Sequence, residues 1–157
     1  MAIPNLPRSV PRRTMHRFHI GASPSNAQAM EQPSFLAASV YVALGGGLGS
    51  WLRYGVGRLI GGSAFPSATL TVNIAGSFAM GLLVGWLARS GEDSEGWRLL
   101  LGVGMLGGFT TFSAFSLDIV TLVQRGAIAL AVQYIVLSLA GGVAGLIAGL
   151  ALIRAAA

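Results

Sequence analysis

The polar side chains inside the apolar segments of this sequence are mostly neutral hydrogen-bond donors. They include an amide, several hydroxyls and one arginine near the end of a segment, among them Arg53, Asn73, Thr110, Thr111, Ser113, Ser116, Tyr134 and Ser138. Amide N–H groups and hydroxyls can donate hydrogen bonds to an anion, and the edge of a phenyl ring carries the positive part of its quadrupole. Phe112 and Phe115, three residues apart, could present such edges to one path. This combination is better suited to a small anion than to a cation.

Each of these residues also has a purely structural interpretation. Asn73 could hydrogen-bond a neighbouring helix, which contributes about 1 kcal/mol in a membrane. The two phenylalanines could pack against lipid or other helices, and Arg53 could extend its charged end to the membrane surface. Taken one at a time, the residues leave these alternatives open.

The sequence lacks the residues on which most catalytic sites depend. It has no cysteine, and its only histidines, His16 and His19, precede the first apolar segment. No acidic residue lies deep in an apolar segment, since Asp118 is near the far end of the third one. Nucleophilic, paired-carboxylate and metal-hydrolase mechanisms therefore lack their parts, and we expect a protein that is not an enzyme.

Composition indicates the elements that must position the polar residues. The chain is 54% hydrophobic and 10% charged, whereas soluble domains are about 25% charged. Four apolar segments cover approximately residues 35–56, 68–88, 97–123 and 127–153. Each is close to the length of about 20 residues that a helix needs to cross a membrane. Pairs such as Gly45 and Gly49 would let helix backbones approach closely. We therefore expect an all-α membrane protein, with four transmembrane helices in residues 35–157.

The third segment contains a stretch that is poorly suited to a continuous helix. Residues 107–116 open with two glycines and continue through four hydroxyl residues. Glycine weakens a helix by about 1 kcal/mol per residue, and Ser and Thr offer the backbone competing hydrogen bonds. Non-helical backbone at membrane depth is tolerated where it is buried in protein or lines a polar path. We predict a broken third helix, which is either part of an ion path or a packing kink.

The first residues differ in composition from the rest. Residues 1–32 carry four prolines and four arginines, a composition typical of disorder. We expect residues 1–34 to be a disordered basic extension, or alternatively the result of a start assigned upstream of Met30. Apart from this extension the chain is nearly neutral, so a nucleic-acid partner is not indicated.

The arginines outside the extension are balanced between the two ends of the predicted helices. With four spans, Arg89, Arg98 and Arg154 fall on one side, and Arg53, Arg58 and Arg125 fall on the other. Arginine bias normally sets orientation, so a chain with almost none could insert in both directions. Two oppositely inserted copies would form an antiparallel dimer, and an ion path would lie between the subunits.

Together these residues resemble the Fluc/CrcB family of fluoride channels. The resemblance covers approximately residues 39–154. It rests on the glycine-rich stretch from Gly45 to Arg53, on the second-segment residues 69–73 that end in Asn73, and on the third-segment stretch 107–116. It implies a passive, selective fluoride channel, a multi-pass protein of the cell's inner membrane that lowers cytoplasmic fluoride.

The resemblance also implies roles for individual residues. The pore residues would be Asn73, Phe112, Phe115, Ser113, Thr69, Tyr134 and Ser138. Arg53 would lie in the aqueous vestibule. The backbone carbonyls of Gly107 and Thr110 would bind a structural Na⁺ at the centre of an antiparallel homodimer.

Two positions depart from the family's pattern. Ala114 replaces a threonine that commonly follows the serine of the third-segment motif, and Gly142 stands where the polar row of the fourth segment often continues with serine. These departures leave the detailed ion path open. One alternative function is a small dual-topology multidrug or metabolite exporter, against which the absence of a carboxylate from the first segment argues. Another is a membrane assembly subunit that transports nothing.

Overall fold

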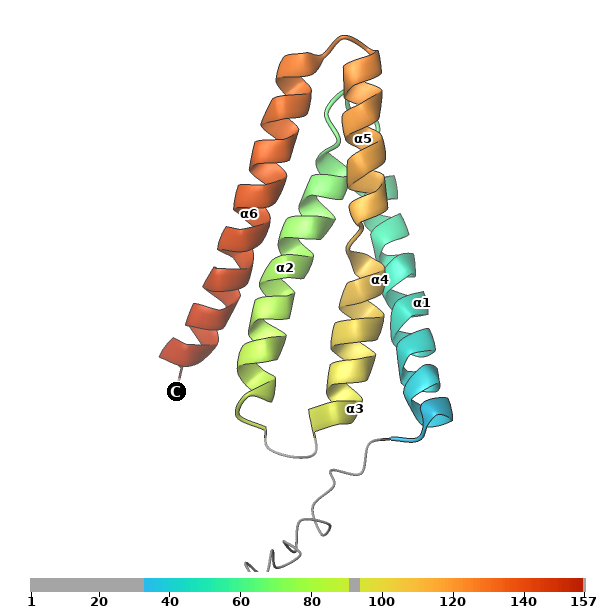
Figure 1. The fold of residues 1–157 in the computed structure, drawn as a ribbon, viewed down its shortest axis with the longest axis vertical. Coiled ribbons are helices and arrows are strands. Elements are labelled where there is room, and N and C mark those ends of the chain that lie inside the picture. Colours follow the sequence, from blue (N-terminus) through green and yellow to red (C-terminus); the bar gives the residue numbers. More distant parts are fainter. Residues whose placement is uncertain (1–32, 91–93, 157) are drawn as a thin grey trace, which may run out of the picture. The chain divides into compact units, whose positions relative to one another are not determined.

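The structure is a computed structural model that describes residues 33–90 and 94–156 (Figure 1). Except for residues 33 and 34, the predicted extension lies outside the described residues. The secondary structure of the described part is helical throughout. Its elements are α1 (Phe35–Ile60), α2 (Ser67–Leu87), α3 (Glu95–Trp97), the π-helical segment η2 (Arg98–Leu106), α4 (Gly107–Phe109), α5 (Phe112–Gln124) and α6 (Ile128–Ala155).

The four predicted membrane-spanning segments are confirmed. The helices that are long and apolar enough to cross a membrane are Phe35–Ile60, Ser67–Leu87, the interrupted span Glu95–Gln124, and Ile128–Ala155. The first helix ends later than predicted, at Ile60 rather than near residue 56. Arg53 therefore lies about two turns inside α1 and not near its end.

Local signals explain where the helices begin and end. The Ser34 side chain accepts a hydrogen bond of 3.3 Å from the Ala37 N–H and caps α1. Gly62 and Gly126, in the turns that follow α1 and α5, have φ angles of +106° and +71°. Only glycine adopts such angles readily, so these two residues mark the sharp reversals between spans.

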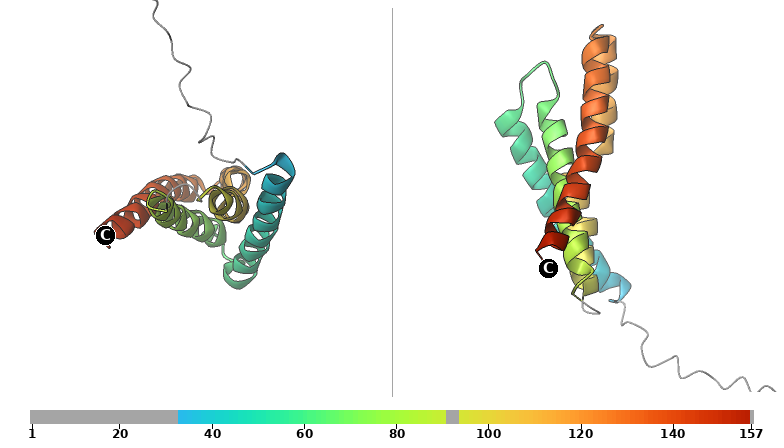
Figure 2. Two further views of the ribbon diagram at one scale, coloured as in Figure 1. Left: turned by 90° about the horizontal axis from the view of Figure 1, so that it is seen from below. Right: turned by 90° about the vertical axis from the view of Figure 1, so that its left-hand side faces the viewer.

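The helices pack through glycines, as the sequence predicted. The third span lies between α1 and α2, and α2 also packs along α6 (Figure 2). A side chain at Gly45 or Gly49 would meet the backbone of η2, at Leu100 O and Met105 O. A side chain at Gly149 of α6 would likewise meet Phe78 O of α2. These contacts are between backbones, so the helices approach more closely than larger residues would allow.

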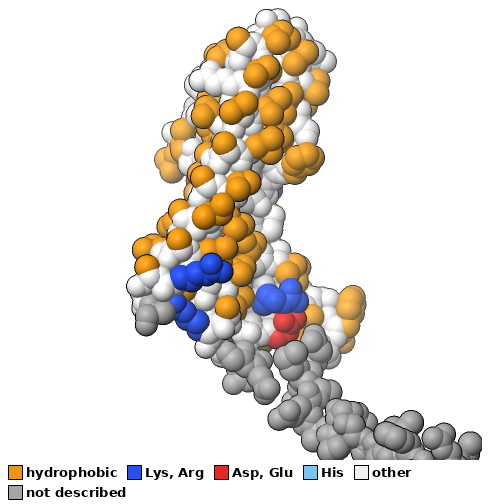
Figure 3. All heavy atoms as spheres, turned by 60° about the vertical axis from the view of Figure 1, so that its left-hand side comes forward, with side chains coloured by type: hydrophobic (Ala, Val, Ile, Leu, Met, Phe, Trp, Pro, Cys, Tyr) orange, Lys and Arg blue, Asp and Glu red, His pale blue; other side chains and the backbone are white. Residues whose placement is uncertain are grey.

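Only a small part of the apolar surface is buried within the chain. Phe115, Leu122, Ala131 and Tyr134 form a buried cluster between α5 and α6. Large hydrophobic side chains are exposed on every span. On the face in Figure 3 they cover most of the height, and charged side chains gather at the end where α6 terminates. A surface of this kind is suited to lipid and to further helix packing.

Candidate functional site

The predicted break in the third span is present between α4 and α5. Thr110 has φ −82° and ψ 158°, and Thr111 has φ −153° and ψ 120°. Both residues are extended, whereas the residues on either side are helical. Two consecutive extended residues deprive nearby peptide groups of their helical partners, and in a membrane those groups need partners from within the protein.

Asn73 of α2 supplies two of these partners. Its Oδ1 accepts a hydrogen bond of 2.8 Å from the Thr111 N–H, and its Nδ2 donates one of 3.1 Å to the Thr111 carbonyl. The side chain thus pairs with both backbone groups of one extended residue, as a neighbouring strand would. An amide nitrogen carries two hydrogens, and this pairing uses one of them. The interhelical hydrogen bond considered for Asn73 is therefore present, and one donor remains.

The break also releases the two carbonyls that the sequence analysis associated with Na⁺. In a continuous helix the Thr111 N–H would pair with Gly107 O, and the Ala114 N–H with Thr110 O. The Thr111 N–H pairs with Asn73, and the Ala114 N–H donates to Thr111 Oγ1 at 3.2 Å. Both carbonyls have thereby lost their usual helical donors.

Arg53 holds a third carbonyl of the interrupted span. Its Nε donates a hydrogen bond of 3.1 Å to Gly108 O, and Ser50 Oγ lies 3.5 Å from the same oxygen. Arg53 therefore ties α1 to α4 beside the break. Arg53, which was predicted to lie in the vestibule, therefore also supports the backbone of the third span.

A cavity of about 290 Å³, here called the central pocket, lies beside the break. It is lined by Asn73, Gly76, Ser77, Met80, Thr110, Thr111, Phe112, Phe115, Ser138, Leu139 and Leu146. Ser138 Oγ is buried and has no hydrogen-bond partner among the described residues. Buried polar atoms almost always have a partner, so this hydroxyl is available to a water molecule or an anion in the pocket.

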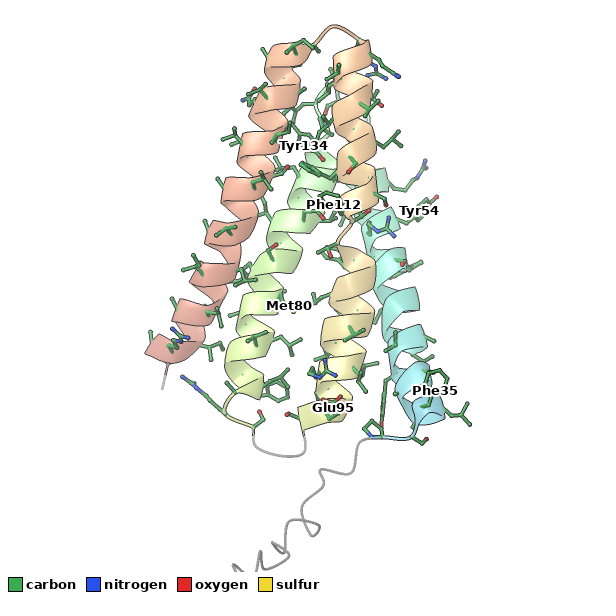
Figure 4. All side chains as sticks on the ribbon, viewed as in Figure 1. Phe35, Tyr54, Met80, Glu95, Phe112 and Tyr134 are labelled. Carbon is green, nitrogen blue, oxygen red and sulfur yellow. The ribbon has the colours of Figure 1, made fainter. Side chains whose placement is uncertain are left out.

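The two phenylalanines lie at different depths. Their ring centroids are 5.7 Å apart, with the ring planes at 42°. Phe112 is 78% exposed and Phe115 only 8%. Phe115 packs in turn on Tyr134, at a centroid distance of 5.2 Å. Phe112 therefore lies at the edge of the subunit, level with the break (Figure 4), whereas Phe115 belongs to the interior.

Tyr134 uses its hydroxyl within the subunit. Its side chain is completely buried, and the hydroxyl donates a hydrogen bond of 3.1 Å to Asp118 Oδ2. Figure 4 places the ring between α6 and α5. The contact joins the two helices on the side of the break that leads to their connecting turn.

A second cavity, the arginine pocket, also has a volume of about 290 Å³. It is lined by Arg53, Tyr54, Gly57, Arg58, Ala68, Thr69, Val72, Thr111 and Ala114. Two guanidinium groups and the Thr69 hydroxyl make its wall attractive to an anion. Thr111 contributes to both pockets, so both pockets adjoin the helix break.

The structure brings together most of the predicted site residues. Asn73, Phe112, Phe115 and Ser138 line the central pocket, and Arg53 and Thr69 line the arginine pocket. Ser113 and Tyr134 are not in either lining. Ser113 Oγ lies 3.1 Å from Thr111 Oγ1 and is exposed beside the break.

Sequence reasoning missed four contributors to this region: Arg58, Ser77, the Thr111 backbone and Asp118. Ser77 follows Asn73 by one helical turn, and that spacing could have identified it. The Thr111 pairing had no sequence signal beyond the predicted break. Within residues 33–90 and 94–156, no group of three or more His, Asp or Glu side chains could hold a metal ion.

The chain matches one family model and is similar in sequence to known proteins. Residues 40–150 match the family model described as "CrcB-like protein, Camphor Resistance (CrcB)". A protein of Novosphingobium aromaticivorans named fluoride-specific ion channel FluC is 53% identical over 127 residues, which cover 78% of this chain and all of the relative. Proteins of the same name from Methylobacterium nodulans and Rhodospirillum centenum are 51% and 54% identical over 118 residues. These matches cover 74% and 73% of this chain, and 95% and 94% of the relatives.

Proposed function

The chain belongs to the CrcB-like family, and we propose from this membership that it is a passive channel for fluoride ions. It is a multi-pass protein of the inner membrane and not an enzyme. An open path lets fluoride leave the cytoplasm and so reduces its toxicity. The exporter alternative is not supported, because the similar proteins are named as fluoride-specific channels.

The structural observation that supports this proposal is the composition of the central pocket. One amide N–H of Asn73, two phenyl rings and the Ser138 hydroxyl, which has no partner in the described part of the chain, share one cavity beside the helix break. A small anion loses its hydration in such a cavity and needs donors in return. A hydrogen bond to a charged group contributes about 1.5–3 kcal/mol, so a few donors can replace part of the water shell.

Asn73 has two functions in this proposal. Its pairing with Thr111 holds the break open and fixes the side chain, and its remaining N–H donates to fluoride. A donor held in this way needs no rearrangement when the ion arrives. The edges of Phe112 and Phe115 and the hydroxyls of Ser113, Thr69 and Ser138 would complete the path. Tyr134 would join them by turning its O–H from Asp118 to the ion.

The arginine pocket would collect anions before they enter the narrower path. Arg53 and Arg58 raise the local concentration of anions by attraction. Because Thr111 lines both pockets, an ion held near Arg53 is already next to the break. Arg53 therefore serves as a vestibule residue while its Nε supports Gly108.

The complete channel would be an antiparallel homodimer. Near-zero arginine bias allows insertion in both directions, and the large apolar surface of one chain offers area for a partner. The exposed Phe112 supports a path completed by the second subunit, because a ring at the edge of one subunit can line a path only when another surface faces it.

A structural Na⁺ at the dimer centre fits the released carbonyls of Gly107 and Thr110. Carbonyl oxygens are suitable ligands for a hard cation, and the hydrogen bonds around the break have removed the usual donors of these two oxygens. When bound, the ion supplies positive charge that holds carbonyl oxygens together. Arg53, Ser50 and Asn73 orient the surrounding backbone.

The test is fluoride efflux from liposomes that contain the purified protein, measured with a fluoride electrode. Efflux should begin when a K⁺ ionophore is added, because the movement of a lone anion is electrogenic. Parallel liposomes loaded with chloride should retain it. Absence of fluoride release from verified dimeric protein would overturn the proposed function.

A further inference from the structure

We propose that Ser77 of α2 is an additional fluoride-contacting residue, and that its hydroxyl continues the row of donors where Gly142 of α6 has no side chain. The inference rests on the proposed channel function. It assigns one more residue to the ion path and explains how the path proceeds past the glycine.

The two helices carry matched pairs of positions. Ser138 and Gly142 are four residues apart on α6, and Asn73 and Ser77 are four residues apart on α2. Residues with this spacing lie on the same face of a helix. Because α2 and α6 pack along each other, each pair forms one side of the same contact region.

Ser77 and Gly142 meet directly. A Cβ placed on Gly142 would lie 3.5 Å from Ser77 Oγ, and no other atom of a neighbouring helix is within 4 Å of that Cβ position. The hydroxyl of Ser77 therefore lies beside the space that a side chain at residue 142 would enter. A serine at either position would bring a hydroxyl to nearly the same place.

The central pocket connects this hydroxyl to the other donors. Asn73, Ser77 and Ser138 all line the pocket, and Ser138 Oγ is buried without a partner among the described residues. Farther along, its wall is formed by apolar residues, namely Met80, Leu139 and Leu146. Ser77 is the last hydroxyl residue of α2, and Ser138 is the last of α6. An ion that moves past Ser138 thus finds its next hydroxyl on α2.

The experiment compares four proteins in the fluoride efflux assay: wild type, Ser77→Ala, Ser77→Ala with Gly142→Ser, and Ser77→Ala with Gly142→Ala. Alanine preserves the helix and nearly the volume of serine, so the first change removes little more than the hydroxyl. The alanine at residue 142 is the matched control, because it adds the Cβ without a hydroxyl. Size-exclusion chromatography and thermal unfolding check that each variant assembles and folds like the wild type.

We expect Ser77→Ala to lower fluoride efflux by about tenfold, the effect of losing one hydrogen bond to a charged ion. Gly142→Ser should restore most of the lost efflux, and Gly142→Ala should restore none. If Ser77→Ala releases fluoride as fast as the wild type does, the inference is overturned. A loss that neither substitution repairs, or that both repair equally, would also overturn it. In each of these cases, fluoride release by the wild-type protein shows that the channel function itself stands. Failure of the wild-type protein to release fluoride would instead contradict the channel function.

Discussion

The hydroxyl of Tyr134 donates a hydrogen bond of 3.1 Å to the carboxylate of Asp118, and this contact joins α6 to α5 inside the membrane-spanning region. Tyr134 was predicted, from the family resemblance, to be a pore residue. In the structure its ring is buried against Phe115, and its hydroxyl already has an acceptor. Tyr134 therefore positions Phe115 and Asp118 within the subunit, whether or not it also meets the ion.

The Tyr134–Asp118 contact should be measurable as a coupling energy. Tyr134→Phe keeps the ring and removes the donor, so we expect the free energy of unfolding to fall by about 1.5–3 kcal/mol. Asp118→Asn retains an acceptor and should have a smaller effect. The double variant should lose less unfolding free energy than the sum of the losses in the two single variants. Chemical unfolding of the purified protein in detergent provides the measurement, and strict additivity would contradict a direct interaction.

Substitution of Asn73 should affect both conduction and stability. Asn73→Ala leaves the Thr111 N–H and carbonyl without the partners they have in the structure. A buried group that loses its partner costs about 1–3 kcal/mol, so thermal unfolding should shift to lower temperature while fluoride efflux is lost. A residue that only contacted the ion would affect efflux alone. Unchanged unfolding of Asn73→Ala would therefore show that the pairing with Thr111 contributes little.

Arg53 and Arg58 line the same pocket, which provides a matched comparison. Of these two arginines, only Arg53 donates a hydrogen bond to Gly108 O. Arg58→Gln should lower efflux modestly and more at low salt, because it removes only attraction at a distance. Arg53→Gln should lower efflux about tenfold or more at any ionic strength, because it also releases the carbonyl beside the break. Equal effects with the same salt dependence would mean that Arg53 acts through its charge alone.

Much of the fold follows from local features of the sequence. Apolar length predicts four helices, and the pair Gly107–Gly108 followed by hydroxyl residues predicts the break. The first apolar segment was predicted to end near residue 56, whereas α1 continues to Ile60. The helix continues to Ile60 because an early end inside a membrane would leave backbone groups unpaired.

The site itself was only partly predictable. Residue types identified Asn73, Ser138 and the phenylalanines as a set, and the structure places them around one cavity. The pairing of Asn73 with Thr111 joins residues 38 positions apart, and no local pattern encodes such a contact. The proximity of Ser77 to Gly142 depends in the same way on how α2 and α6 are aligned.

The close contact between α1 and the third span predicts opposite effects for two glycines of the same helix. A Cβ at Gly49 would overlap Met105 O and lie 2.8 Å from Phe109 N, both of which are backbone atoms that cannot rotate away. A Cβ at Gly47 would meet nothing within 4 Å. Gly49→Ala should therefore destabilise the protein by about 1–3 kcal/mol, as overpacking does. Gly47→Ala should leave stability unchanged or raise it by up to about 1 kcal/mol, because alanine is the better helix former.

The two glycine variants should also differ in conduction. Phe109 is the last residue of α4, so a displacement forced at Gly49 moves the backbone immediately before Thr110 and Thr111. Gly49→Ala should lower fluoride efflux in liposomes even at temperatures where the protein remains folded, and Gly47→Ala should conduct like the wild type. Thermal unfolding and efflux measured on the same preparations separate the two effects. Normal efflux from a destabilised Gly49→Ala protein would show that the break tolerates movement of α1, and that Asn73 and Arg53 suffice to hold its geometry.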